Sequence, residues 1–98
     1  MIRAVFAHDF SGFSLSGHAG YADAGEDIVC AAVSAMTNLA VNGAEAFGAV
    51  AQVSAEEGSL SYRMDNDCGE AKQLLESFYK ELVKLQSLYP KHVRVTQK

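Results

Sequence analysis

The sequence is poor in the residues that mark disordered or disulfide-stabilised proteins. Its 98 residues include a single proline, two cysteines and no tryptophan, while 49% are hydrophobic and 20% are charged. This composition is typical of a folded chain, and the length suffices for one hydrophobic core without a separate cofactor domain. We therefore expect one domain over residues 1–98 that works without a cofactor.

Long apolar runs without polar interruption are also absent. The longest uncharged run, residues 28–44, is broken by four polar residues: Ser34, Thr37, Asn38 and Asn42. The run therefore falls short of a membrane span, and Met1 leads directly into a strand-like segment rather than a secretion signal. We expect a cytoplasmic protein that does not bind membranes and whose cysteines stay reduced.

Positive charge is scarce as well. Twelve acidic residues outnumber eight lysines and arginines, and the formal net charge is -4. A surface of this sign repels phosphate backbones, so the charge disfavours direct binding of nucleic acid. It favours a basic partner or peptide, although many ordinary cytoplasmic proteins have a similar charge and no such partner.

Hydrophobic periodicity divides the chain into five strands and two helices. A short apolar run predicts a strand at residues 2–7, and further strands are predicted at residues 13–16, 49–55, 59–64 and 92–96. Steps of three and four residues predict a first helix that ends near Gly43 or Gly48. A second helix begins at Asp67, where a capping box with Glu70 is expected, and ends before Pro90.

The resulting order, β-β-α-β-β-α-β, predicts a mixed α/β (α+β) fold with about five strands in one mixed sheet. Residues 2–7 are apolar on both parities, which is typical of a strand covered on both faces. We therefore expect the two helices to lie on opposite faces of the sheet.

A histidine and a cysteine flank one loop in the stretch GHAGYADAGEDIVCAAVS, which begins at Gly17. With Asp27 as the N-cap, Cys30 is the third residue of the first helix, where unpaired amides and the helix dipole stabilise a thiolate. His18 continues the parity of Ser16, so its imidazole is expected to point away from the apolar side of the strand. The loop is long enough to bring the helix start beside the strand end.

Such a pair supports acyl transfer. The histidine removes the thiol proton, the thiolate attacks a carbonyl, and free N–H groups at the helix start stabilise the oxyanion. Asp27 is a candidate for orienting His18, and equally an ordinary helix cap. Ser34 lies one turn after Cys30 and can hydrogen-bond either the site or a carbonyl of its own helix.

The intervening loop contains three glycines, Gly17, Gly20 and Gly25. They fit a mobile lid over a substrate cleft, and equally a tight loop that requires positive φ. Tyr21, in the same loop, is a candidate wall of the substrate site.

Taken alone, neither residue of the pair establishes a catalytic site. A cysteine among small apolar residues is more often a buried hydrophobe, and a histidine that ends a strand is usually a surface residue. A zinc site would need scattered ligands without paired spacing, so we expect no metal. Its ligands would be His18, Cys30, Cys68 and either His8 or His92. We interpret Cys68 as a structural thiol, because no histidine accompanies it in the sequence.

The block H-A-G-Y-A followed by G-x-D-I-V-C-A-A-V-S resembles the Prp family of bacterial ribosomal-processing cysteine proteases, and the resemblance covers essentially the whole chain. It implies that His18 and Cys30 are the catalytic pair and that Asp27 and Ser34 occupy the accompanying acid and serine positions. It also implies a homodimer that removes a short N-terminal extension from a large-subunit ribosomal protein, cutting after an aromatic residue. A non-catalytic ribosome-assembly or protein-interaction module is the alternative, because no sequence proves turnover.

Overall fold

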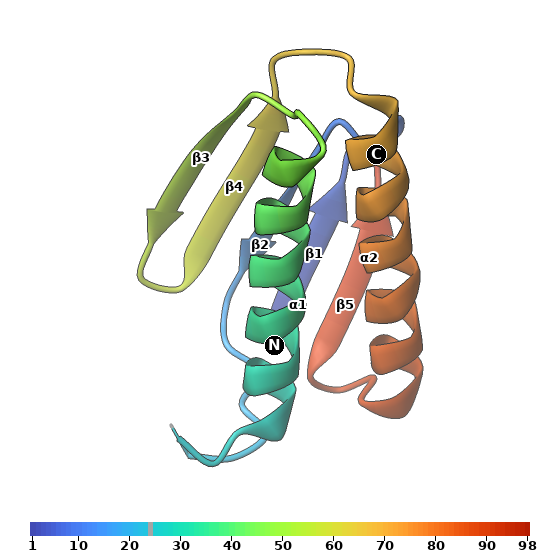
Figure 1. The fold of residues 1–98 in the computed structure, drawn as a ribbon. Helices are drawn as coiled ribbons and strands as arrows, with labels where there is room; N and C mark the ends of the chain where they lie inside the picture. The colour runs from blue at the N-terminus through green and yellow to red at the C-terminus, as the bar shows by residue number, and fades with distance from the viewer. Residues whose placement is uncertain (24) are drawn as a thin grey trace.

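Five strands and two helices follow one another in the order that the sequence predicts (Figure 1). The computed structural model describes residues 1–23 and 25–98. The elements are β1 (Ile2–Phe6), β2 (Gly12–Ser16), α1 (Ile28–Ala46), β3 (Ala51–Glu56), β4 (Ser59–Met64), α2 (Gly69–Leu88) and β5 (Val93–Gln97). The strands form one sheet in the order β3-β4-β2-β1-β5, in which only β1 and β5 are parallel neighbours. The mixed α+β class is thereby confirmed.

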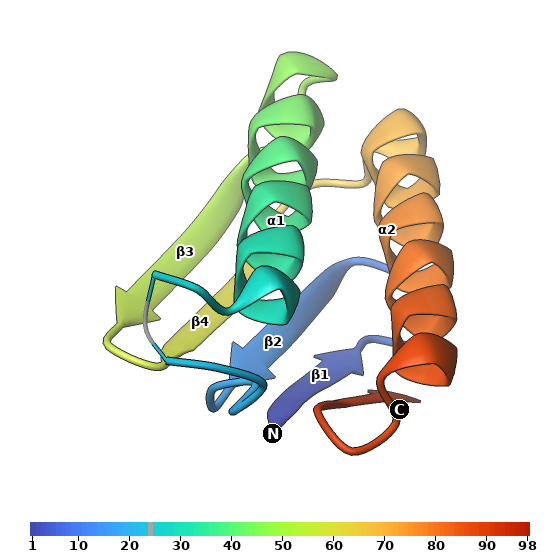
Figure 2. The same cartoon turned by 90° about the horizontal axis from the view of Figure 1, so that it is seen from below.

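Both helices cover the same face of the sheet, so the prediction of helices on opposite faces is wrong (Figure 2). The two helices also contact each other: a Cβ atom added at Gly43 of α1 would lie 2.6 Å from a methyl carbon of Leu74 in α2. The reason lies in the connections. α1 joins β2 to β3 and α2 joins β4 to β5, and each pair is parallel within the sheet. The two crossovers run in opposite directions along antiparallel strands, so the right-handed rule places both helices on one side.

The apolar pattern of residues 2–7 has a different origin from a second layer of helices. Val5 of β1 lies on the open face, where it is half-buried, and its neighbours in register are Ser14 of β2 and Thr96 of β5. Arg3, on the same face, is exposed. Residues 2–7 are thus apolar at both alternating positions because the open face holds one half-buried valine between hydroxyl side chains, and not because a helix covers that face.

The core lies between the sheet and the helices and is built around aromatic rings. Phe6 stacks on Phe13 at 5.5 Å between ring centroids and packs edge-on against Phe78 of α2, also at 5.5 Å. Phe13 in turn stacks on Tyr62 of β4 at 5.4 Å. Burial of each such ring stabilises the fold by about 1.5–3 kcal/mol, so these contacts hold α2 and the central strands as one unit.

α1 packs on this core through small side chains. Its buried residues are Val29, Val33, Thr37, Ala40 and Ala44. Length and composition alone would allow α1 to cross a membrane, unlike the expectation from its polar interruptions, but core helices of soluble proteins have the same property. Here α1 lies against the sheet and α2, and this packing fixes the position of its first turn.

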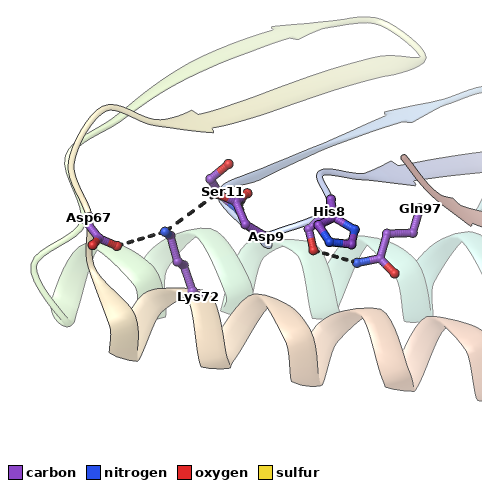
Figure 3. Close-up of polar contacts among 6 residues, drawn as sticks. All are labelled: His8, Asp9, Ser11, Asp67, Lys72 and Gln97. Atoms are coloured by element: carbon purple, nitrogen blue, oxygen red, sulfur yellow. Dashed lines mark hydrogen bonds and ion pairs between the residues drawn. The ribbon is translucent and has the colours of Figure 1, made fainter.

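Polar contacts fasten the other end of the molecule, where α2 begins (Figure 3). Lys72 of α2 donates a hydrogen bond to Asp67 at 2.8 Å and lies 3.8 Å from the carboxylate of Asp9, in the β1–β2 turn. The hydrogen bond to Asp67 raises the pKa of Lys72. The predicted capping box is wrong: Cys68 is the N-cap, without a side-chain cap bond, because the carboxylate of Asp67 binds Lys72 instead.

Candidate active site

The end of β2, the start of α1 and the β3–β4 turn meet at one end of the molecule (Figures 1 and 2). They enclose an open pocket of about 340 Å³ that contains both His18 and Cys30. Its apolar lining comes from Ile2, Leu15, Val33 and Leu60, and its polar lining includes Ser34 and Asn38. Both residues of the predicted pair therefore line the same cavity, together with Ser34.

Asp27 organises the start of α1, and Cys30 is the third helical residue as predicted. Its Oδ1 atom accepts hydrogen bonds from the amides of Val29 at 3.0 Å and Cys30 at 2.9 Å, while Oδ2 accepts from Tyr21 at 3.1 Å. The amide of Cys30 is the main cause that holds the pKa of Asp27 below its ordinary value. The carboxylate is thus ionised at neutral pH, and it both caps the helix and ties down the loop.

These bonds alter the predicted oxyanion site. The sequence predicts that free N–H groups at the helix start stabilise the oxyanion, but Asp27 already accepts hydrogen bonds from the amides of Val29 and Cys30. A different donor reaches the sulfur: the amide of Ala19 lies 3.3 Å from Sγ of Cys30. The sequence offers no sign of this contact, because the two residues meet only when the loop folds back.

His18 reaches the pocket by a route that the strand parity did not predict. β2 ends at Ser16, and Gly17 adopts φ +87°, which interrupts the alternation of side chains. His18 lies beyond this break, lines the pocket with Cys30 and Val33, and is itself exposed. Strand parity does not determine the direction of its imidazole, and the expectation that it points away from the apolar side stays a prediction.

The β3–β4 turn forms a wall that sequence reasoning missed. The carbonyl of Gly58 accepts a hydrogen bond from the amide of Gly17 at 2.9 Å. A Cβ atom added at Gly58 would lie 3.3 Å from Nε2 of His18, so the imidazole rests against this glycine. The hairpin pattern identifies the turn, but nothing local in it indicates a contact with residues 17 and 18.

The loop glycines adopt the left-handed conformation that the tight-loop alternative requires. Gly17, Gly20 and Gly25 have φ values of +87°, +67° and +90°. Tyr21 lies outside the lining of the pocket and packs its ring edge-on against Tyr89 and against His92, each at 5.4 Å between centroids. In this conformation the loop is thus anchored to the α2–β5 turn.

The second cysteine lies far from this site. The sulfur of Cys68 is 3.4 Å from the carbonyl of Phe47, at the C-terminal end of α1, whereas Cys30 is in the first turn. The length of α1 from Cys30 to Phe47 separates the two cysteines by about 25 Å, so no disulfide or shared zinc ion can join them. Both are free thiols, and within residues 1–23 and 25–98 no three potential ligands cluster as a metal site.

Comparison with known proteins agrees with this geometry. The family model of cysteine protease Prp matches residues 1–94. This chain belongs to that family. It is accordingly a cysteine protease, and the resemblance inferred from the histidine and cysteine blocks is confirmed.

Solved structures share the fold over its whole length. The ribosomal processing protease Prp from S. aureus, with a covalently linked product peptide, is 24% identical with a TM-score of 0.93, and each chain is covered completely. The same protease with a substrate peptide is 23% identical with a TM-score of 0.86, again over both full chains. SMU.848 from Streptococcus mutans is 27% identical with a TM-score of 0.79, over 99% of this chain and 93% of that one. A search of curated protein sequences found no match.

Proposed function

We propose that this protein removes a short N-terminal extension from a large-subunit ribosomal protein by cutting the peptide after an aromatic residue. The observation that carries the proposal is one apolar pocket containing both His18 and Cys30, with the Ala19 amide directed at the sulfur. The S. aureus relatives, described as ribosomal processing proteases and bound to substrate and product peptides, support the same substrate class.

The groups in the pocket supply each step of thiol proteolysis. His18 removes the proton of Cys30, and the thiolate attacks the scissile carbonyl carbon. The resulting oxyanion accepts a hydrogen bond from the Ala19 amide, which contacts the sulfur. When the tetrahedral intermediate collapses, the peptide C–N bond breaks and His18 protonates the leaving amine. His18 then activates a water molecule, which hydrolyses the thioester and regenerates the thiol.

The apolar lining provides the preference for an aromatic residue before the cut. Side chains from β1, β2, α1 and β4 surround the cavity beside the nucleophile. An aromatic ring placed there leaves water and contacts aliphatic groups, whereas an alanine leaves the cavity wet. The glycine-rich loop beside the pocket supplies backbone hydrogen bonds to the extended peptide.

The active form that we propose is a cytoplasmic homodimer. Three large apolar side chains near the end of α1 and along the edge strand β3 are exposed: Phe47 by 56%, Val50 by 61% and Val53 by 49%. A second copy that covers them would remove this apolar surface from water. Light scattering of the protein should give twice the monomer mass, and a monomeric mass would refute the dimer.

Peptides that span the cut test the proposed activity. Wild type should cleave the aromatic peptide, and alanine before the cut should lower kcat/KM about a hundredfold, which corresponds to losing ~3 kcal/mol of aromatic burial. Cys30→Ala should abolish cleavage while the circular dichroism spectrum and the oligomeric state stay unchanged. Cys68→Ala is the matched control and should keep activity. A folded wild type that cuts no peptide would favour the non-catalytic module instead.

A further inference from the structure

His92, the residue before β5, contacts the loop residue that reaches the Cys30 sulfur. Its Nδ1 atom lies 2.9 Å from the carbonyl oxygen of Ala19. Because a carbonyl only accepts hydrogen bonds, Nδ1 carries the proton. The amide of Ala19 donates to Sγ of Cys30 at 3.3 Å. One residue of the loop is thus held by the imidazole on one side and directed at the nucleophile on the other.

Ala19 needs such an anchor. It lies between Gly17 and Gly20, which adopt φ values of +87° and +67° and which have many accessible conformations when unrestrained. Its methyl group is buried, with 2% of the residue exposed. With the methyl group buried and the carbonyl bound to His92, the direction of the amide is determined.

His92 is itself held in place from two sides. Its carbonyl accepts a hydrogen bond from the amide of Ile2 at 2.9 Å, which ties it to β1. Its ring packs edge-on against Tyr21 at 5.4 Å between centroids. The imidazole therefore has a fixed position from which to bind the loop.

We propose that His92 is a positioning residue of the active site. Through the bond from Nδ1–H to the Ala19 carbonyl, it keeps the Ala19 amide against the Cys30 sulfur and so stabilises the thiolate. The bond survives protonation of the ring, because an imidazolium also carries a proton on Nδ1. The proposal rests on Cys30 as the nucleophile of the proposed function, but it concerns the sulfur itself and not the peptide that is cut.

Two substitutions separate the hydrogen bond from the packing of the ring. His92→Phe keeps an aromatic ring beside Tyr21 but has no donor. His92→Asn loses the ring, but its side-chain N–H group stands at the same distance from Cβ as Nδ1 does. The measurement is the rate of Cys30 alkylation by iodoacetamide at mildly acidic pH, read by mass spectrometry. We expect His92→Phe to slow it about tenfold and His92→Asn to stay within about twofold of wild type.

His92→Ala is a second donor-free variant that needs no space for a larger ring, and it should be slowed as much as His92→Phe. The melting temperature of every variant is measured, and alkylation is followed well below the lowest of them, with Cys68 as the internal reference. Wild-type rates in the Phe and Ala variants would overturn the proposal, as would an Asn variant as slow as the Ala variant. A dependence on His92 in a protein that cuts no peptide would refute only the proposed function.

Discussion

The two cysteines both lie at the start of a helix, yet the groups around the two sulfurs differ. Sγ of Cys30 accepts a hydrogen bond from the Ala19 amide and shares a pocket with His18. Sγ of Cys68 donates to the carbonyl of Phe47 at 3.4 Å, and a carboxylate oxygen of Glu70 lies 4.0 Å away. The first sulfur is thus an acceptor for a backbone amide, whereas the second faces a carbonyl and a carboxylate oxygen.

This difference shows that a helix start alone does not create a nucleophile. Both sulfurs experience the positive end of a helix dipole, so that contribution cannot distinguish them. The side-chain cap separates the two helices further: Asp27 caps α1 with its carboxylate, whereas α2 has no side-chain cap bond. The neighbours that the tertiary structure places around each sulfur decide its chemistry.

The sharpest test of the comparison is the relative reactivity of the two thiols. Iodoacetamide at mildly acidic pH should modify Cys30 at least about a hundredfold faster than Cys68, because only Cys30 combines a donor to the sulfur with access to solvent. Peptide mapping by mass spectrometry gives both rates in one sample. In urea the two rates should converge. Equal rates in the folded protein would show that the surroundings of the two sulfurs do not change their reactivity.

Removing the cap on α1 should lower the melting temperature and the activity more than removing the acid in the first turn of α2. Asp27→Ala removes the bonds to the helix amides and to Tyr21, so we expect the melting temperature to fall by about 5 °C and kcat/KM to fall about tenfold. Asp27→Asn keeps an oxygen that can cap the helix, but an NH2 group replaces the oxygen that accepts from Tyr21. Compared with Asp27→Ala, it should recover more of the melting temperature than of the activity. Glu70→Ala is the control at α2. If it reduced activity as much as Asp27→Ala, the site would not depend on the α1 cap.

Two glycines with positive φ, one at each end of the molecule, test whether the β3–β4 turn positions His18, and the expected effect is smaller. Gly58 touches His18, whereas Gly48, with φ +104°, has open space where a Cβ would stand. Alanine at either position should cost about 1 kcal/mol of stability, because both adopt the left-handed conformation. Only Gly58→Ala should also lower kcat/KM, by about fivefold, since the methyl group displaces the imidazole. Equal activity of the two variants would mean that the turn does not position His18.

The smallest expected effect is on the pH dependence of stability. Hydrogen bonds from the Cys30 amide lower the pKa of Asp27, and the Ser11 hydroxyl is the main group that lowers the pKa of Asp9. Each carboxylate therefore contributes stability that is complete above the ordinary carboxyl pKa of about 4 and is lost as the pH falls through the lower folded value. On acidification, the melting temperature should fall less in Asp27→Asn and Asp9→Asn than in wild type.

Only one of these two substitutions should affect the nucleophile. Asp9 lies at the far end of the sheet beside Lys72, so Asp9→Asn should leave Cys30 labelling unchanged. Asp27→Asn should slow it, because the loop loses the bond at Tyr21. Unchanged labelling in both variants would show that the loop holds the Ala19 amide without Asp27.

Local patterns in the sequence were enough to predict much of this protein. The order of elements, the position of Cys30 in the first turn of α1 and the helix cap at Asp27 all depend on residues within one or two turns of each other. Periodicities of 2 and 3.6 and the chemistry of caps act over the same short range. The histidine and cysteine blocks also sufficed to predict the family, because they lie within one continuous stretch.

The tertiary structure alone decided the layer and the inner arrangement of the site. Both helices share a face because of the order of the strands, which no single segment encodes. Gly58 supports His18, and His92 binds Ala19 across 73 positions of sequence. The alternation of β2 does not extend to His18, because Gly17 before it adopts a positive φ. Such contacts form between distant segments only when the whole chain packs, so periodicity along the sequence carries no record of them.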